Sequence, residues 1–151
     1  QTFVLAAWQV FVLANLFGWF RADGTRRFRE GYIEVGRKNG KSTFMAGIGL
    51  YMLLADDEPG AEIYTAATKK DQAKIVFDEA VRMRKASKFL STRIDCVRNN
   101  LSVAITNSKF EPLCSEEDTL DGLNIHCALV DELHMHPTRK LYDVLFEATK
   151  A

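Results

Sequence analysis

The chain has 151 residues, of which 47% are hydrophobic and 26% are charged, which suits a single globular domain with a substantial core. Its 20 basic and 20 acidic residues give a formal net charge of +0. The overall charge therefore points to no class of partner, and any surface for nucleic acid would have to be local.

Cysteine spacing and hydropathy argue against three further classes of protein. The three cysteines lie far apart, without the CxxC or Cys/His spacing of a zinc site or the pattern of a disulfide framework. Cys96 and Cys127 fall in expected strands, where we expect buried thiols. No apolar run reaches the roughly 18 residues of a membrane span, so we expect no membrane partner.

The first 30 residues predict one helix and one turn. Apolar residues recur at helical spacing between Phe3 and Phe20, which predicts an amphipathic helix, and the charged run 21–30 predicts a turn around Asp23. Gln9 in this helix has two interpretations. Its amide donates and accepts hydrogen bonds, so it is able to read adenine if a phosphate-binding loop follows. Alternatively, it is a polar residue on a packed helix.

A glycine-containing turn between a short apolar run and a helix is the most informative part of the chain. Residues 32–43 read YIEVGRKNGKST. The run 32–35 predicts a strand, and Lys41 opens an apolar helix that reaches about residue 54. When a strand is followed by a tight loop and the first turn of a helix, several backbone N–H groups are directed at one anion. The stretch resembles the P-loop pattern G-x-x-x-x-G-K-S/T, except that Val35 occupies the first glycine position and Gly36 follows it.

A P-loop would give these residues distinct roles. Lys41 reaches the β- and γ-phosphates of a nucleotide, and the hydroxyl group of Ser42 binds Mg²⁺. Gly40 allows the backbone to approach the phosphates closely. The alternative is a basic turn before an ordinary helix. The predicted nucleotide-binding residues of this stretch are Gly36, Arg37, Lys38, Asn39, Gly40, Lys41, Ser42 and Thr43.

The middle of the chain predicts alternating strands and helices. The acidic Pro-Gly segment 56–60 ends the first apolar helix, and a Thr/Lys loop follows the next strand, where an α/β sheet places ligands. Pro112 lacks an N–H group, so its strand is expected to be short or at an edge. The predicted elements are strands 61–66, 93–97, 101–105 and 109–114, a helix at 69–86 and a polar loop at 115–124, the second and third strands forming a hairpin.

A second apolar run, at residues 125–130, ends in Asp131 and Glu132. In P-loop enzymes a strand of this kind carries the aspartate that holds the Mg²⁺ shell, which predicts a metal-side role for Asp131. An adjacent glutamate can take a proton from the attacking water, so Glu132 is the predicted general base. The alternative is a buried strand that ends in a solvated acidic turn.

The last residues predict a loop and a helix. His134 and His136 lie two positions apart without a third ligand, so we expect a loop near the phosphates that has no metal ion of its own. Apolar residues recur at helical spacing between Leu141 and Ala148 and predict a helix over residues 138–151.

The order of these motifs resembles the N-terminal ATPase half of the large terminase subunit of tailed bacteriophages. The resemblance covers essentially the whole chain, and terminases of this type often lack the first P-loop glycine and carry an arginine inside the loop. It implies an α/β fold of the ASCE-type P-loop NTPases, a three-layer sandwich with a mainly parallel sheet. Because this chain continues for only about 20 residues after Asp131, we expect its sheet to be incomplete at the C-terminal side. The motifs that carry it are Trp8-Gln9, the loop 35–42, the strand end 64–69 and the segment 129–134.

The resemblance implies a motor that uses ATP and Mg²⁺ to drive double-stranded DNA into a procapsid. Gln9 would then read adenine, Ser42 and Asp131 would hold Mg²⁺, and Glu132 would activate water. Arg37 occupies the place of a loop arginine that acts on the γ-phosphate, so together with Lys41 and Glu132 it is predicted to be catalytic.

The family also implies partners. An arginine acting in trans across a ring interface is expected, and Arg82 and Arg84 are the candidates. The implied partners are double-stranded DNA, the portal protein, the small terminase subunit and further copies of the chain in a ring, in the cytoplasm of a bacterial host.

Length is the main departure from the family. In the family, a coupling motif, a linker and a nuclease domain follow the acidic pair. This chain continues for only about 20 residues after Asp131. We therefore expect residues 1–151 to be a fragment of the ATPase domain, composed of an N-terminal helix and loop (1–30) and a P-loop core (31–151). We expect weak ATP turnover and no nuclease activity from these residues.

Two other functions are compatible with the same motifs. A helicase-like nucleic-acid translocase would use the same loop and strand ends, and a second RecA-like lobe after residue 151 would distinguish it. A non-catalytic docking domain that keeps a nucleotide pocket is the other alternative. Glu132→Ala should abolish turnover but spare binding in an enzyme, and should change nothing in a docking domain.

Overall fold

The computed structural model describes residues 3–114 and 123–149, and the chain divides into two compact units, Gln1–Lys41 and Ser42–Ala151. The predicted polar loop 115–124 lies outside the described residues except for its last two. Within the described part of the chain, no helix is both long enough and apolar enough to cross a membrane.

The first unit consists of one helix and a segment that turns back from it. Helix α1 spans Ala7–Gly18, and so is shorter at both ends than the predicted helix. After the turn, the backbone N–H of Arg27 donates to the carbonyl of Trp19 at 2.9 Å. The guanidinium group of Arg26 lies 4.8 Å from the centre of the Phe17 ring. A backbone hydrogen bond and a cation–π contact therefore close the predicted charged turn.

The strand predicted at residues 32–35 is wrong. These residues form no β-ladder with any described residue, and Tyr32 is 76% exposed. A short apolar run becomes a strand only where a neighbouring strand offers its unpaired backbone groups. Because this segment pairs with no described strand, the chain before the glycine turn is irregular.

The second unit is built around a five-stranded sheet in the order β2-β3-β4-β1-β5. β1 pairs in parallel with β4 and with β5, whereas the pairs β2–β3 and β3–β4 are antiparallel. Of the five strands of this sheet, only β3 is antiparallel to the others, which confirms the predicted mainly parallel α/β fold. β5 lies at one edge of the sheet. The strands are β1 (Glu62–Ala67), β2 (Asp95–Val97), β3 (Asn100–Val103), β4 (Ser108–Cys114) and β5 (Ile125–Val130).

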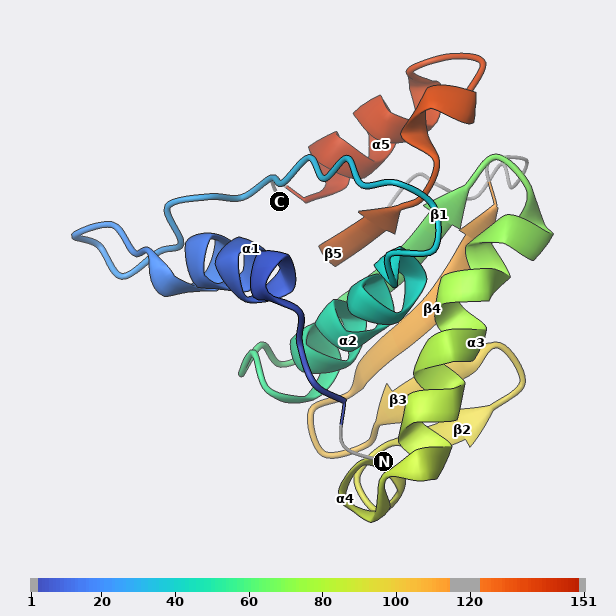
Figure 1. The fold of residues 1–151 in the computed structure, drawn as a ribbon. Coiled ribbons are helices and arrows are strands. Elements are labelled where there is room, and N and C mark those ends of the chain that lie inside the picture. The colour runs from blue at the N-terminus through green and yellow to red at the C-terminus, as the bar shows by residue number, and fades with distance from the viewer. Residues whose placement is uncertain (1–2, 115–122, 150–151) are drawn as a thin grey trace. The chain divides into compact units, whose positions relative to one another are not determined.

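Helices lie on both faces of this sheet (Figure 1). Helices α2 (Lys41–Leu54) and α3 (Lys70–Ala86) cover one face, and α5 (Lys140–Ala148) packs on the other. The sequence indicated all three, because each has a clear apolar face or a strong stop signal. It did not indicate the short helix α4 (Lys88–Ser91) or the 3₁₀ turn η1 (Leu133–Met135).

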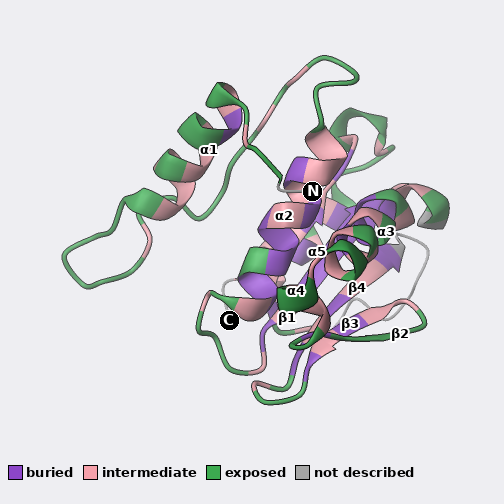
Figure 2. Cartoon of the chain, turned by 60° about the horizontal axis from the view of Figure 1, so that its bottom comes forward, coloured by how far each residue is buried: buried purple, intermediate pink, exposed green. Residues whose placement is uncertain are grey.

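Two separate groups of apolar side chains hold the layers together. On one face, α2 presses closely onto the sheet at Gly49, where a Cβ atom would stand 2.7 Å from ring atoms of Phe110 and 3.1 Å from Leu129. On the other face, Leu141 and Leu145 of α5 pack with Tyr64 of β1 and its neighbours. Figure 2 shows this pattern, with buried residues concentrated in the strands and in α2. The second unit therefore has the predicted three-layer arrangement.

Pro112 and Cys96 occupy positions that their sequence context did not indicate. β4 is an interior strand, although Pro112 predicted a short or edge strand. β3 pairs only with Ser108–Phe110 of β4. On that side Pro112 therefore faces no described strand, and its missing N–H group costs no hydrogen bond. Cys96 is exposed rather than buried, because all three residues of the edge strand β2 are exposed.

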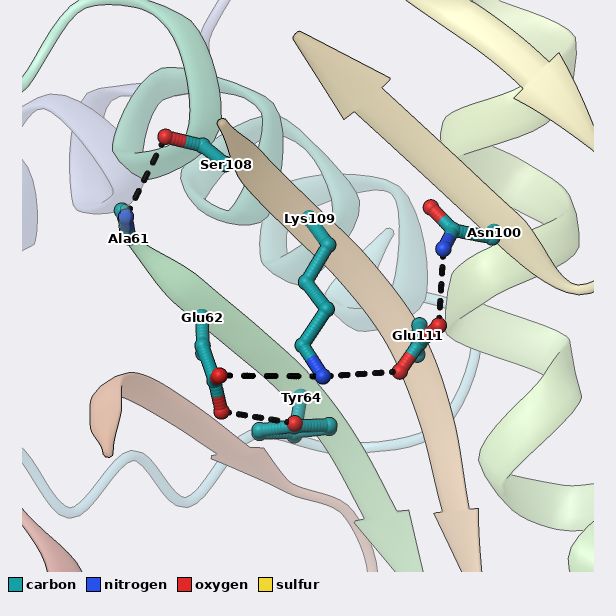
Figure 3. Close-up of polar contacts among 7 residues, drawn as sticks. All are labelled: Ala61, Glu62, Tyr64, Asn100, Ser108, Lys109 and Glu111. Carbon is teal, nitrogen blue, oxygen red and sulfur yellow. Dashed lines mark hydrogen bonds and ion pairs between the residues drawn. The ribbon is translucent and has the colours of Figure 1, made fainter. Parts of the chain in front are cut away.

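A charged network lies on the sheet face opposite α2 and α3 (Figure 3). The Nζ atom of Lys109 is 3.7 Å from Oε1 of Glu62 and 3.5 Å from Oε2 of Glu111. The hydroxyl of Tyr64 donates to Glu62 at 2.9 Å, and the amide of Asn100 donates to Glu111 at 2.7 Å. Burial raises the pKa of the Tyr64 hydroxyl. Although burial opposes its charged form, the contacts with Tyr64 and the two carboxylates raise the pKa of Lys109. The network therefore keeps a neutral tyrosine and a charged lysine across β1, β3 and β4.

Candidate functional site

The glycine turn of the first unit forms a tight loop. Lys38 and Gly40 adopt left-handed conformations, with φ angles of 65° and 74°. The Nδ2 atom of Asn39 donates to the carbonyl of Gly36 at 3.0 Å. A glycine adopts this conformation without steric cost, whereas few other residues do. Residues 36–40 are all exposed, so the loop is compact and accessible.

Gln9 lies beside this loop in the same unit. A Cβ atom on Gly40 would lie 3.7 Å from Nε2 of Gln9, so the predicted adenine reader and the predicted phosphate loop are neighbours. Gln9 is 4% exposed, and its Oε1 atom accepts a hydrogen bond from the backbone N–H of Ala6 at 2.8 Å. The acceptor end of the amide therefore caps the first turn of α1, and its donor end faces the loop.

Three polar segments of the second unit lie at the carboxyl ends of the parallel strands (Figure 1). Ser42 and Thr43 lie in the first turn of α2, Thr68 follows β1 and Asp131 follows β5. The backbone N–H of Asp131 donates to the carbonyl of Ala66 at 2.9 Å, which extends the ladder between β5 and β1. This edge is where α/β sheets bind ligands, and it carries the hydroxyl and the carboxylate that were predicted to hold Mg²⁺.

The acidic pair leaves β5 through an unusual backbone conformation. Asp131 is 8% exposed, and its Oδ1 atom accepts a hydrogen bond from the backbone N–H of Glu132 at 2.9 Å. Glu132 has φ 48° and ψ 49°, a left-handed conformation that non-glycine residues rarely adopt and that often occurs at functional sites. The Glu132 side chain is 38% exposed, and its Oε2 atom lies 3.5 Å from Nε2 of His134. The turn thus buries Asp131 and leaves the side chain of Glu132 partly accessible.

The described side chains at the strand ends offer too few ligands for a metal site built from protein groups alone, but they suit the few protein ligands that Mg²⁺ usually takes. Among the described residues, no group of three or more His, Cys, Asp or Glu side chains could hold a metal ion. Mg²⁺ usually takes only one or two protein oxygens and completes its shell with water and substrate phosphates. A serine hydroxyl and one buried carboxylate, Ser42 and Asp131, are compatible with that mode of binding.

Glu79 contacts this region, although no sequence motif indicated it. The Oγ1 atom of Thr43 donates to Oε1 of Glu79 on α3 at 3.0 Å, and Glu79 also pairs with Arg82. The Glu79 side chain is 15% exposed. The sequence offers no signal that would select Glu79 over the adjacent Asp78. Only the packing of α3 beside α2 brings Glu79 into contact with Thr43.

The contact between Glu79 and Thr43 leads to a stability prediction. Glu79→Ala is expected to lower the free energy of unfolding by about 1–2 kcal/mol, because a half-buried hydrogen bond to a charged group is lost. Asp78→Ala, at an exposed neighbouring position, should change it by less than about 0.5 kcal/mol. Urea-induced unfolding followed by circular dichroism measures both. Equal losses in the two variants would mean that the hydrogen bond does not stabilise the start of α2.

The two candidate arginines differ in their surroundings. Arg84 donates from Nε to the carbonyl of Ile94 at 2.7 Å and from Nη2 to the carbonyl of Ser91 at 3.3 Å. It therefore ties the end of α3 to the segment that follows. The side chain of Arg82 is 77% exposed. Of the two, Arg82 is the more accessible to a second subunit.

Comparison with known proteins relates the chain to one family. Residues 7–151 match the family model described as terminase large subunit, ATPase domain. The structure is similar to the crystal structure of the HK97 bacteriophage large terminase, with a TM-score of 0.84 and 25% sequence identity over 99% of this chain and 31% of that chain.

Two further solved structures share the fold. They are the ATPase domain of the Thermus phage P74-26 large terminase and an arginine-to-alanine mutant of it, with TM-scores of 0.61 and 0.62 and sequence identities of 23% and 20%. Each match covers 76% of this chain and 52% of the other. The chain therefore spans less than two thirds of each of these proteins. No curated protein sequence matches it.

Proposed function

Because the chain belongs to the family of terminase large subunit ATPase domains, we propose that it hydrolyses ATP to drive double-stranded DNA into a phage procapsid. The family supports nucleotide binding and ATP hydrolysis in general. The observation that supports the proposal for this chain is that Ser42, in the first turn of α2, and Asp131, directly after β5, both lie at the carboxyl ends of the parallel strands (Figure 1).

The proposed site assigns one task to each group of residues. The loop 36–40 and Lys41 bind the phosphates, and the amide of Gln9 recognises adenine. Ser42 and Asp131 hold Mg²⁺, which neutralises phosphate charge when it is bound. The loop arginine, Arg37, acts on the γ-phosphate.

Glu132 completes the proposed chemistry. Its carboxylate orients a water molecule in line with the γ-phosphate and takes a proton from it. The protein otherwise contributes mainly positioning and charge neutralisation, since phosphoryl transfer requires little covalent work from it.

The proposal extends to the wider assembly. In the proposed organisation, residues 1–30 supply a helix and a loop and residues 31–151 supply the P-loop core of the ATPase domain. We expect weak turnover and no nuclease activity from these residues. The partners are the portal protein, the small terminase subunit and further copies in a ring, in the host cytoplasm. DNA contact is expected through the phosphate backbone, largely independently of sequence.

Lys41→Ala tests the nucleotide site directly. The parent chain should bind ATP with micromolar affinity in the presence of Mg²⁺, and the variant should bind about 10–100-fold more weakly, since it loses a charge-assisted contact with the phosphates. Isothermal titration calorimetry with and without Mg²⁺ provides the measurement. Lys140→Ala, an exposed lysine of α5, serves as the control. A folded parent that binds no ATP, or a variant that binds as well as the parent, would refute the proposed site.

A further inference from the structure

Residues 84–93 carry a concentration of charge that the overall composition hides. These ten residues contain four basic and no acidic side chains, giving a net charge of +4 in a chain whose total is +0. They comprise the end of α3, the connecting residue Ser87, the short helix α4 and the two residues after it. The segment therefore creates a local positive field.

Three of the four cationic side chains are on the surface. Lys85, Lys88 and Arg93 are exposed, and we call these three residues the basic patch. The guanidinium carbon of Arg93 lies 3.9 Å from the centre of the Phe89 ring, and its Nη1 atom donates to the Phe89 carbonyl at 3.2 Å. Phe89 is itself 57% exposed. Stacking holds the arginine in place at the surface, so less entropy is lost when it binds an anion.

The dipole of α3 explains only part of this charge. Cations stabilise the last turn of a helix, but the effect falls off beyond that turn. Arg84 and Lys85 lie in the last turn, and Arg84 already binds two backbone carbonyls. Lys88 and Arg93 lie beyond the end of α3, where the helix dipole does not account for them.

The basic patch lies away from the predicted nucleotide site. Glu79 of α3 contacts Thr43 at the start of α2, and from Glu79 the helix continues for seven residues, or about 10 Å, before it ends at Ala86. α4 lies at the far end of α3 from the strand ends (Figure 1). The phosphates of an ATP molecule at the strand ends are therefore not the ligand of the patch, and a second polyanion is required.

We propose that Lys85, Lys88 and Arg93 form a surface of this domain that binds the phosphate backbone of double-stranded DNA. This inference rests on the proposed function, which supplies duplex DNA as the substrate. Two flexible lysines and a stacked arginine suit sequence-independent contact, because duplex DNA presents one negative charge per about 1.7 Å of its axis. Three such contacts give weak binding, which suits a motor that must release each position as the DNA advances.

The test compares two variants that lose the same charge. Lys85→Ala combined with Lys88→Ala removes two contacts from the patch. Arg21→Ala combined with Arg29→Ala removes two exposed charges from the turn at 21–30. The binding of the 151-residue chain to a labelled duplex of mixed sequence is followed by fluorescence anisotropy over a range of salt concentrations.

The expected result is a change in the salt dependence. For the patch variant, the slope of log K against log salt concentration should become shallower by about 1.8, which corresponds to two lost phosphate contacts. Affinity at about 0.1 M salt should fall at least tenfold, and the charged-turn variant should retain the parental slope. Equal losses in the two variants, a loss confined to the charged turn, or tighter binding of the parent to single-stranded DNA or RNA than to the duplex would overturn the inference.

ATP binding measured on the same preparations separates this inference from the proposed function. A parent that binds Mg²⁺–ATP but no duplex would refute the basic patch and leave the nucleotide site intact. A parent that binds duplex through the patch but no ATP would refute the nucleotide site and support the patch. The patch variant should bind ATP as the parent does, because its substitutions lie away from the nucleotide site.

Discussion

Glu132→Gln is expected to slow ATP hydrolysis by about 10²–10⁴-fold, which is the usual contribution of a general base, and to leave ATP binding nearly unchanged. Glutamine has the size of glutamate and its hydrogen-bonding reach but cannot accept the proton of the attacking water. Glu132 leaves β5 in a left-handed conformation with its carboxylate partly exposed, so the substitution should not disturb the strand. Single-turnover measurements with the chain in excess over ATP detect the loss even if turnover of the parent is slow.

Glu58→Gln is the matched control for this experiment. Glu58 is an exposed acid in the loop after α2, and its conversion removes the same charge without touching the strand ends. Hydrolysis should therefore stay at the parental rate. Equal measurable rates in the parent and in Glu132→Gln would show that Glu132 is not the base. ATP binding without hydrolysis in both proteins would instead favour the non-catalytic docking domain.

Gly49→Ala is expected to lower the free energy of unfolding by about 1–3 kcal/mol, the usual cost of overpacking a core. On helix propensity alone the change should stabilise the protein by about 1 kcal/mol. The new methyl group would stand 2.7 Å from the ring of Phe110. This ring is fully buried and packs edge-on against Phe77 at 5.7 Å between ring centres, so it has little space in which to move.

Gly47→Ala separates the packing effect from helix propensity. Gly47 lies in the same helix, but a Cβ atom there would be 3.8 Å from the Cε atom of Met83, an ordinary contact. Gly47→Ala should therefore leave stability unchanged or raise it by up to about 1 kcal/mol. Urea denaturation of the two variants provides the comparison. A stabilised Gly49→Ala protein would mean that the close approach of α2 to the sheet relaxes at little cost.

The elements with strong local signals are the ones that the sequence predicted well. The apolar run 125–130 coincides with β5 (Ile125–Val130), and α2 ends before the acidic Pro-Gly segment as expected. Hydrophobic periodicity and helix stop signals act over a few residues, so they can be read from the chain itself. The predicted hairpin also forms, as β2 and β3.

Other features depend on partners that are distant in the sequence. The run 32–35 has the composition of a strand but pairs with no described strand. β4 is interior in spite of Pro112, because its pairing with β3 stops at Phe110. Cys96 was expected to be buried, but it lies in an edge strand. Local composition does not specify which strand lies beside which, so these three expectations were wrong.

The sequence by itself determined the family motifs, the order of most helices and strands, and the residues with the chemistry to bind a nucleotide. Only the tertiary structure decided that Asp131 is buried beside the end of β1 and that Glu79 contacts Thr43, 36 positions away in the sequence. It also decided that Arg84 binds backbone carbonyls while Lys85 and Lys88 remain exposed. The physical reason is that burial and hydrogen-bond partners are properties of packed elements, whereas motifs and periodicity are properties of neighbouring residues.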